Sequence, residues 1–485
     1  MALNILFDLD GTLTDPAEGI TNGIKYMLEK KGLPVPPTEE LYQFIGPPLV
    51  PSFMSVFGMT EEEAKDGVRL YREYYAPTGL FENHPYEGIG EALGKLRDLG
   101  FVIGLATSKP EEFAYKILER FGLIGYFDKV SGASLTENRT EKAQVIAYAL
   151  ERMGAEAKDT IMVGDRKHDV LGAKEFGIPT VGVLWGYGSD EELKEAGAVR
   201  TVSTMDEMVA VLKDKRDAKL IETMVKAGVE ASRAISGIYR SEYKVEIKED
   251  DSPVTSADLA SEKIIIPTLM AEFPIMSVLS EESCDSDSEE RLHNRHGVFI
   301  IDPLDGTVEF VNRTGEFSVS IGYSLDHRAY AGVIAVPELG LVYYACEGHG
   351  AYKLTFDEYT EDFTLGCGTI IHVSDRTDNL RVTVSRTYKT PETDGLLERH
   401  KSRISEVLTV GSCLKGCRIA EGLAEVHYRY GDKTKEWDTA AMQCIVEEAG
   451  GLFINYDGTV PKLNRKDYYN RGGFIILNRA EARLE

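Results

Sequence analysis

A chain of 485 residues is about three times as long as a typical domain, so two or three domains are expected. Its formal net charge of −26 argues against a nucleic acid polymer or an anionic membrane as partner, because both attract a basic surface. A hydrophobic content of 43% is typical of soluble globular proteins, and no apolar run is long enough to span a membrane. The start, M-A-L-N-I-L-F-D, lacks a basic region before an apolar core, so no secretory signal is expected and the expected location is cytoplasmic.

Short apolar segments alternate with amphipathic segments over the first 210 residues. The segments expected to be buried parallel strands are 4–8, 101–107, 159–165 and 180–186. Between them, Phe113, Ile117 and Leu118 fall on one helical face. This alternation predicts a doubly wound α/β sheet. Residues 16–85 interrupt it with helical, aromatic-rich sequence, which predicts a helical cap inserted between the first two strands.

Residues with carboxylate, hydroxyl and amino groups follow these strands. F-D-L-D-G-T at 7–12 places Asp8 and Asp10 at a strand end, where open α/β sheets bind ligands. A-T-S-K-P at 106–110 ends the next strand, Lys142 begins a helical segment, and V-G-D-R-K-H-D at 163–169 contributes two further acids. A carboxylate nucleophile, a second carboxylic acid, phosphate-binding groups and metal-binding acids are what phosphate-ester hydrolysis through an aspartyl phosphate requires.

Residues 1–212 resemble the haloacid dehalogenase superfamily of phosphatases on these motifs, and most of all its phosphoglycolate phosphatase and 5′-nucleotidase branch. The resemblance implies that Asp8 attacks phosphorus and that Asp10 protonates the leaving oxygen and then deprotonates water. The implied phosphoryl ligands are Thr107 and Lys142, and the implied ligands of one Mg²⁺ are Asp8, the Asp10 carbonyl and Asp165, with Asp169 in support. Lys109 could share the role of Lys142, but the preferred interpretation is a helix-start residue beside Pro110.

The second half has a different pattern. A helix-period segment at about 217–240 precedes strands with period-two alternation at 317–323 and 330–336. These features predict an α/β layered domain with antiparallel strands. The charge run K-D-K-R-D at 213–217 marks the boundary, so the expected domains are 1–214, with the cap at about 16–85, and 215–485.

The letters L-D-G-T return in D-P-L-D-G-T at 302–307, where the acids are three apart instead of two. S-E-E at 280–282 follows an apolar segment, and E-W-D-T-A-A at 436–441 opens a helix. Glu281, Asp302, Asp305 and Asp438 would repel one another unless cations lay among them, which indicates two or three Mg²⁺ ions. The two L-D-G-T segments are therefore interpreted as different chemistry and not as a repeat.

This half, at about 217–485, resembles the inositol monophosphatase superfamily, and within it the 3′(2′),5′-bisphosphate nucleotidases. The resemblance rests on D-D-S-P-V-T-S-A-D at 250–258, V-S-R at 384–386, G-S-C-L-K at 411–415 and A-E-G-L-A-E-V-H-Y-R-Y at 420–430. It implies the layered sandwich of the sugar phosphatases. The implied metal ligands are Glu281, Asp302, the Leu304 carbonyl, Asp305 and Asp438; Asp258 and Thr307 would activate water for in-line attack without a covalent intermediate. The candidate substrate-binding residues are Ser385, Arg386, Ser412, Lys415 and Arg429.

Two residues depart from that family's pattern: Val308 stands where lysine is usual, and Tyr388 where histidine is common. The expected function is a bifunctional Mg²⁺-dependent phosphatase of small phosphorylated substrates, which converts 3′-phosphoadenosine 5′-phosphate to AMP and AMP to adenosine. One alternative is an inositol monophosphatase or fructose-1,6-bisphosphatase fused to a phosphoglycolate phosphatase. Another makes one half a regulatory phosphate-binding module. The sequence leaves open the exact substrates, coupling between the two sites, and the oligomeric state.

Overall fold

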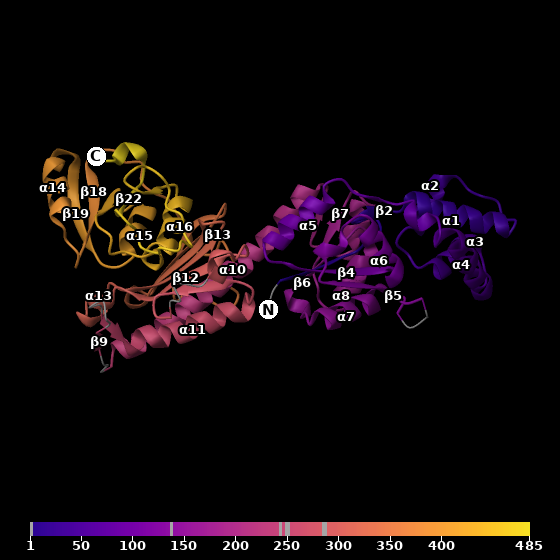
Figure 1. Ribbon diagram of the computed structural model, residues 1–485, viewed down its shortest axis with the longest axis horizontal. Coiled ribbons are helices and arrows are strands. Elements are labelled where there is room, and N and C mark those ends of the chain that lie inside the picture. The colour runs from indigo at the N-terminus through magenta and orange to yellow at the C-terminus, as the bar shows by residue number, and fades with distance from the viewer. Residues whose placement is uncertain (1–2, 136–138, 242–244, 248–252, 284–288) are drawn as a thin grey trace. The chain divides into compact units, whose positions relative to one another are not determined.

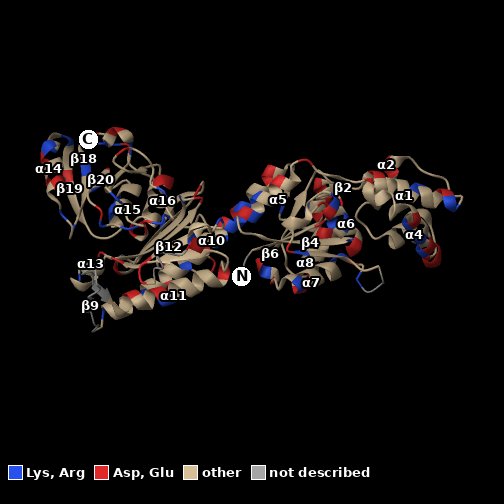
Figure 2. Ribbon diagram, in the orientation of Figure 1, with Lys and Arg blue, Asp and Glu red and all other residues tan. Residues whose placement is uncertain are grey.

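The computed structural model describes residues 3–135, 139–241, 245–247, 253–283 and 289–485 (Figure 1). The chain divides into two compact units, Met1–Asp214 and Lys215–Glu485. The division falls inside helix α10 (Met205–Tyr239), on which acidic and basic residues alternate (Figure 2). Among the described residues, no helix has both the length and the apolar character needed to cross a membrane.

The first unit contains a six-stranded parallel sheet in the order β5-β4-β1-β6-β7-β8. Its strands are β1 (Asn4–Phe7), β4 (Val102–Pro110), β5 (Lys129–Ala133), β6 (Thr160–Gly164), β7 (Thr180–Val183) and β8 (Arg200–Val202). Its helices are α5 (Ile89–Asp98), α6 (Glu111–Arg120), α7 (Lys142–Met153), α8 (Lys167–Lys174) and α9 (Asp190–Ala196). The predicted doubly wound α/β fold is confirmed.

The inserted cap lies between β1 and β4. It consists of α1 (Ala17–Lys30), α2 (Thr38–Leu41), η1 (Tyr42–Phe44), α3 (Leu49–Phe57), α4 (Glu61–Tyr75) and η2 (Gly79–Phe81). A short antiparallel pair, β2 (Thr14–Asp15) and β3 (His84–Pro85), joins its two ends. Helix α4 begins at a capping box in which Thr60 and Glu63 bond each other's backbone, a strong start signal.

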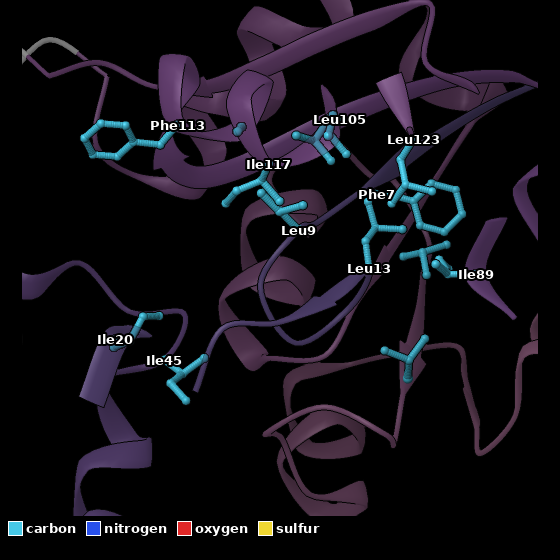
Figure 3. Packing of buried hydrophobic residues seen from close by; sticks show 14 of the residues in the cluster. Phe7, Leu9, Leu13, Ile20, Ile45, Ile89, Leu105, Phe113, Ile117 and Leu123 are labelled. Atoms are coloured by element: carbon cyan, nitrogen blue, oxygen red, sulfur yellow. The ribbon is translucent and has the colours of Figure 1, made fainter. Parts of the chain in front are cut away.

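The core of the first unit is continuous from sheet to helices. Figure 3 shows Phe7 of β1, Leu105 of β4 and Ile117 of α6 among the packed side chains, and each is fully buried. All four residues of β1 are buried, because helices cover both faces of a parallel sheet. The carboxyl ends of β1, β4 and β6 consequently meet at one edge, where the polar motifs follow them.

The second unit contains two sheets. The first has the order β11-β12-β13-β14-β15-β16-β17, and its strands are Ser277–Ser280, Val298–Asp305, Ser318–Leu325, Arg328–Val336, Leu341–Cys346, Gly350–Thr355 and Thr369–Ile371. The second has the order β19-β18-β20-β22-β21, with β18 Leu380–Ser385, β19 Ile404–Val410, β20 Val426–Arg429, β21 Leu452–Ile454 and β22 Phe474–Leu477. Antiparallel pairing dominates the first sheet, as predicted, although β11 and β12 are parallel.

The helices of this unit are α10, α11 (Ser256–Glu272), α12 (Glu289–Leu292), α13 (Thr307–Val311), α14 (Pro391–Arg399), α15 (Leu414–Ala420) and α16 (Ala440–Glu448). Successive residues of β12 face opposite layers: Phe299 contacts Phe273 beyond the end of α11, and Ile300 belongs to the core that includes α15 and α16. Helix α14 packs on the second sheet through Leu396. The result is the predicted layered sandwich, with α10 and α11 on one face of the first sheet (Figure 1).

Candidate active sites

The first unit gathers polar side chains at the carboxyl edge of its sheet, and we call this set the front site. It comprises Asp8 and Asp10 after β1, Thr107 and Lys109 in β4, Lys142 at the start of α7, Asp165 after β6, and Asp169 in α8; all are buried. Gly11 makes the turn with φ +85°, and a Cβ there would meet Asp165 Oδ2 at 2.2 Å. Only glycine fits this position.

Lys142 links two of the front-site carboxylates. Its Nζ lies 2.5 Å from Asp8 Oδ1 and 2.6 Å from Asp169 Oδ1. Burial disfavours the ammonium, but Asp169 and Asp8 outweigh that effect and raise the pKa of Lys142. The lysine therefore remains charged and holds Asp8 in place.

Three carboxylates of the front site form a potential cation site. Ligand atoms of Asp8, Asp165 and Asp169 all lie within 4.8 Å of one another. Asp165 accepts hydrogen bonds from Thr12 Oγ1 at 3.2 Å and from Tyr187 N at 2.8 Å. Burial, followed by the charges of Asp169 and Asp8, raises the pKa of Asp165 well above its ordinary value. A buried all-oxygen cluster with excess negative charge fits Mg²⁺.

Asp10 is held by Lys109 and not by Lys142. Lys109 Nζ lies 2.8 Å from Asp10 Oδ2 and also bonds the hydroxyl of Tyr75 from cap helix α4. Within the described part of the chain, no hydrogen-bond donor reaches the other oxygen, Asp10 Oδ1. Burial raises the pKa of Asp10, and Lys109 partly opposes this. Asp10 thus has one anchored oxygen and one available oxygen.

The interpretation of Lys109 as a helix-start residue is wrong. Lys109 lies within β4, and only 7% of it is exposed. The S-K-P sequence resembled a helix entry because Pro110 does precede α6. Because the backbone is extended here, alternate side chains point to opposite faces of the strand, and the side chain of Lys109 points into the front site.

Replacing Lys109 tests its role. Lys109→Met should lower phosphate-ester hydrolysis at the front site by about tenfold to a hundredfold, because Asp10 loses its ion pair and cap residue Tyr75 its contact. The measurement is steady-state phosphate release. Lys116→Met, on the exposed side of α6, is the matched control and should retain wild-type rates. Equal rates for both variants would contradict the assignment.

A cavity of about 470 Å³ opens beside Asp8 and Asp10. Its cap wall is largely apolar and aromatic, with Phe44, Tyr71 and Tyr75 among the residues that line it. Arg72 of α4 adds positive charge, and Lys65 lines the cavity as an ion pair with Glu61 at 2.8 Å. A phosphate ester with a planar leaving group is compatible with this lining.

The second unit brings acids together at the ends of β11 and β12, and we call this set the rear site. The parallel register pairs Ser280 with Ile301, which places Glu281 beside Asp302. Ligand atoms of Glu281, Asp302 and Asp438 all lie within 4.8 Å of one another. Asp438 ends the 3₁₀ turn η7 (Glu436–Asp438), where it also accepts a hydrogen bond from Lys435 N at 2.8 Å.

Asp305 lies beside that three-residue cluster, and after burial its charge is the largest cause that raises the pKa of Asp438. Its Oδ2 accepts hydrogen bonds from the hydroxyl of Ser412 and, at 2.6 Å, from Cys413 N. A register irregularity in β12 between Asp302 and Asp305 redirects the chain around Pro303. Asp305 still contributes charge, because it raises the pKa of Asp302 after burial and Glu281. Because Oδ2 is engaged, Asp305 would bind a cation shared with the cluster through Oδ1.

The expected water-activating pair is close but not tightly bonded. Thr307 Oγ1 lies 3.4 Å from Asp258 Oδ1 and 3.2 Å from the Leu304 carbonyl. Asp258 Oδ2 is fixed at 2.8 Å by both the amide and the hydroxyl of Thr255 at the start of α11. Residues 250–252 of the motif lie outside the described residues.

The five candidate binding residues have different surroundings. Ser385 Oγ accepts from Tyr388 N at 3.1 Å, and the Arg429 guanidinium lies over the Tyr388 ring at 5.2 Å. The Lys415 ammonium donates to the carbonyl of Ser412, and burial lowers the pKa of Lys415.

Arg386 is already paired. It forms two bonds to Glu316, at 2.6 and 2.8 Å. Glu316 in turn accepts from Gly411 N at 2.9 Å, next to Ser412. Arg386 thus contacts the 411–412 turn through Glu316, while Asp305 acts on the charge of Lys415 and Asp438 on that of Arg429.

Proton uptake by buried acids of the two sites predicts a stability change with pH. Burial, then Asp305 and Glu281, raises the pKa of Asp438 to about 8. Between about pH 4 and 8 the folded protein keeps a proton that the unfolded chain loses, so stability without divalent ions should fall as pH rises, by up to about 1.4 kcal/mol per unit. Asp169, whose pKa burial raises to about 6, acts in the same direction.

The same linkage makes stabilisation by Mg²⁺ depend on pH. Binding requires ionised carboxylates, so Mg²⁺ should raise the unfolding temperature more at about pH 8 than at about pH 5. Thermal unfolding in chelator and in millimolar Mg²⁺ at both pH values measures this. Asp467→Asn, an exposed acid paired with Arg471, provides the control and should not alter the difference. An equal increment at both pH values would contradict cation binding by these acids.

Both parts of the chain are similar to known proteins. Residues 217–484 match the family model described as inositol monophosphatase family, and residues 5–183 match haloacid dehalogenase-like hydrolase. A 5′-nucleotidase of Pseudomonas aeruginosa is 44% identical over 191 residues, which are 39% of this chain and 86% of that protein. A Mycobacterium tuberculosis protein named tyrosine-protein kinase PtkA is 38% identical over 206 residues, 42% of this chain and 70% of that protein. The 3′(2′),5′-bisphosphate nucleotidase CysQ of Aggregatibacter actinomycetemcomitans is 32% identical over 258 residues, 53% of this chain and 92% of that protein.

Proposed function

Because the chain belongs to the inositol monophosphatase family over residues 217–484 and to the haloacid dehalogenase-like hydrolases over residues 5–183, we propose that its two phosphatase domains act on nucleotides. The rear site would remove the 3′-phosphate of 3′-phosphoadenosine 5′-phosphate to leave AMP. The front site would convert AMP to adenosine. Each step is supported by a relative of the corresponding part, one named bisphosphate nucleotidase and one named 5′-nucleotidase.

The observation that carries the proposal for the rear site is the cluster of Glu281, Asp302 and Asp438. Both families are generally dependent on divalent metal, and these acids with Asp305 would hold Mg²⁺, two or three ions in all. Mg²⁺ when bound supplies Lewis-acid stabilisation of phosphate charge. Asp258, anchored by Thr255, would take the proton of the attacking water with Thr307 as its partner.

The remaining rear-site residues would bind the nucleotide. Ser412 lies in the 411–412 turn beside Asp305 and Lys415 follows it, and both would contact the second phosphate. Arg429 stacked on Tyr388 presents both a cation and an aromatic face. That surface would contact the phosphate and the base even though the family's common histidine is absent.

In the front site, Asp8 would attack phosphorus and form an aspartyl phosphate. Asp10 Oδ1, which accepts no hydrogen bond among the described residues, would donate its proton to the leaving oxygen and later accept one from water. Lys142 and Thr107 would hold the phosphoryl oxygens, and one Mg²⁺ would be held at Asp8 and Asp165 with Asp169 in support. The aromatic cap wall favours a nucleoside leaving group over a small polar one such as glycolate.

A panel of phosphate esters tests the assignments. The full chain would be assayed for phosphate release from 3′-phosphoadenosine 5′-phosphate, AMP, phosphoglycolate, inositol monophosphate and fructose 1,6-bisphosphate. ATP with a tyrosine peptide would be included, because one relative has a kinase name. The nucleotides should be preferred at least about tenfold in kcat/KM. Preference for inositol phosphate or phosphoglycolate would replace the nucleotide assignment at the corresponding site.

Lithium should distinguish the two sites. The resemblance to inositol monophosphatases implies inhibition by Li⁺, a small ion that can occupy a magnesium position with half the charge. Millimolar Li⁺ should remove most of the hydrolysis of 3′-phosphoadenosine 5′-phosphate. It should spare hydrolysis of AMP. The ammonium of Lys142 already lies among the front carboxylates, and its positive charge opposes the binding of Li⁺ there. K⁺ at equal concentration is the control; equal inhibition of both substrates would contradict this division.

A further inference from the structure

A third set of metal-ligand side chains lies in the second unit and takes no part in either proposed reaction. It consists of Asp217 on α10, Cys346 at the end of β15, and His349 in the turn before β16. One ligand atom from each lies within 4.8 Å of the others. The two active-site clusters offer carboxylate oxygen alone, whereas this set offers sulfur, nitrogen and oxygen.

The tight turn between β15 and β16 explains how Cys346 and His349 come together. Cys346 pairs with Gly350 in the strand ladder, and His349 N donates to the Cys346 carbonyl at 2.9 Å. Gly348 adopts φ +81°, which allows the chain to reverse. The C-E-G-H sequence thereby returns the imidazole toward the thiol, and His349 Nε2 lies 3.3 Å from Asp217 Oδ2.

Asp217 is held in position by other groups. The hydroxyl of Tyr330 lies 2.9 Å from both of its oxygens, and Arg216 Nη1 lies 3.0 Å from Oδ1. Neither Asp217 nor Cys346 is exposed, while 22% of the His349 side chain is, so solvent reaches the set on the histidine side. Carboxylates fixed by such outer hydrogen bonds are typical of preorganised metal ligands.

Arg216 restricts which cation could bind. Its buried charge is already balanced by Asp217, and its Nη2 donates to Tyr323 OH at 2.6 Å. A hard cation such as Mg²⁺ would add positive charge beside this guanidinium, while Asp217 is already paired with it. When a metal displaces the proton of the Cys346 thiol, the thiolate that forms offsets part of the charge of the metal. Thiolate and imidazole are also donors that Zn²⁺ prefers.

We propose that Asp217, Cys346 and His349 bind one thiophilic divalent cation of the Zn²⁺ class. The bound ion would join α10 to the β15–β16 turn and so stabilise the second unit. Binding would release the thiol proton, and the affinity would therefore rise with pH. This inference does not depend on the proposed substrates of either site.

Cobalt tests the proposal directly, because a Co²⁺–thiolate bond produces a charge-transfer band in the near ultraviolet. The full chain would be titrated with Co²⁺ in millimolar Mg²⁺, which competes at the carboxylate clusters. Wild type should show one thiolate band, and Zn²⁺ should abolish it. Cys346→Ser should lack the band, and His349→Gln should weaken Co²⁺ affinity at least about tenfold.

Cys417→Ser, at another buried cysteine of the same unit, is the matched control and should keep the wild-type band. Cooperative thermal unfolding, measured without added metal, checks that each variant is folded. His349→Gln, in a partly exposed turn, gives an independent test if Cys346→Ser does not fold. Absence of the band in wild type, or a band unchanged in His349→Gln, would overturn the proposal.

Discussion

Asp8→Asn should lower phosphate release from AMP by at least about 10³-fold, while hydrolysis of 3′-phosphoadenosine 5′-phosphate continues at the wild-type rate. The amide cannot attack phosphorus, so the covalent route is lost and not merely slowed. The change is nearly isosteric, and it also removes the ion pair of Asp8 with Lys142. The loss should therefore appear in kcat.

The controls for this variant separate chemistry from folding. Asp66→Asn lies on cap helix α4, where the carboxylate is exposed and paired with Lys31 and Arg69. It should retain the AMP activity, since surface pairs of this kind contribute about 0–1 kcal/mol. Acid-quenched Asp8→Asn protein should also carry no phosphate. Substantial AMP turnover by Asp8→Asn would remove Asp8 from the role of nucleophile.

Asp302→Asn should have the reciprocal effect, a loss of at least about 10³-fold for 3′-phosphoadenosine 5′-phosphate with unchanged AMP hydrolysis. Asp302 is 2% exposed, lies within 4.8 Å of Glu281 and Asp438, and accepts from Leu304 N at 3.0 Å. An amide there weakens cation binding and removes charge from the cluster. Mg²⁺ should consequently stabilise this variant less than wild type at about pH 8.

Asp305→Asn gives a graded comparison within the same site. One oxygen of Asp305 is engaged by Ser412 and Cys413 N, so the change would disturb the 411–412 turn as well as cation binding. We expect a loss of activity here too, with a larger rise in KM than for Asp302→Asn. Asp467→Asn should match wild type. Loss of AMP hydrolysis in Asp302→Asn would contradict two independent sites.

Local sequence was sufficient to indicate where both acid clusters lie. Asp8, Asp165 and Asp302 lie in or directly after buried apolar strands, and adjacent parallel strands end at a common edge. Residues more than a hundred positions apart could therefore be grouped from strand ends alone. The same reasoning indicated the cap, because a long helical stretch between two parallel strands has to leave the sheet.

The direction in which an individual side chain points could not be predicted from local sequence. Lys109 was interpreted as part of a helix entry, yet the extension of β4 to Pro110 points it at Asp10. Arg386 is a candidate substrate ligand, and its pairing with a glutamate 70 residues away could not be predicted from local sequence. For Lys109 the side-chain direction depends on whether one residue is extended or helical. For Arg386 it depends on a partner that is distant in the sequence.

Hydrophobic pattern and motif spacing were enough to predict the two fold types, the order of the motifs, and the acids proposed for each phosphate site. These depend on hydrophobic period and on short spacings, which act within one element and its ends. Packing of distant segments establishes which ions pair, that Asp305 Oδ2 is engaged by Ser412 and Cys413 N, and that Asp217 meets Cys346 and His349. Such contacts join segments across long stretches of chain, and only the packing of layers brings them within the few ångströms over which charge and hydrogen bonds act.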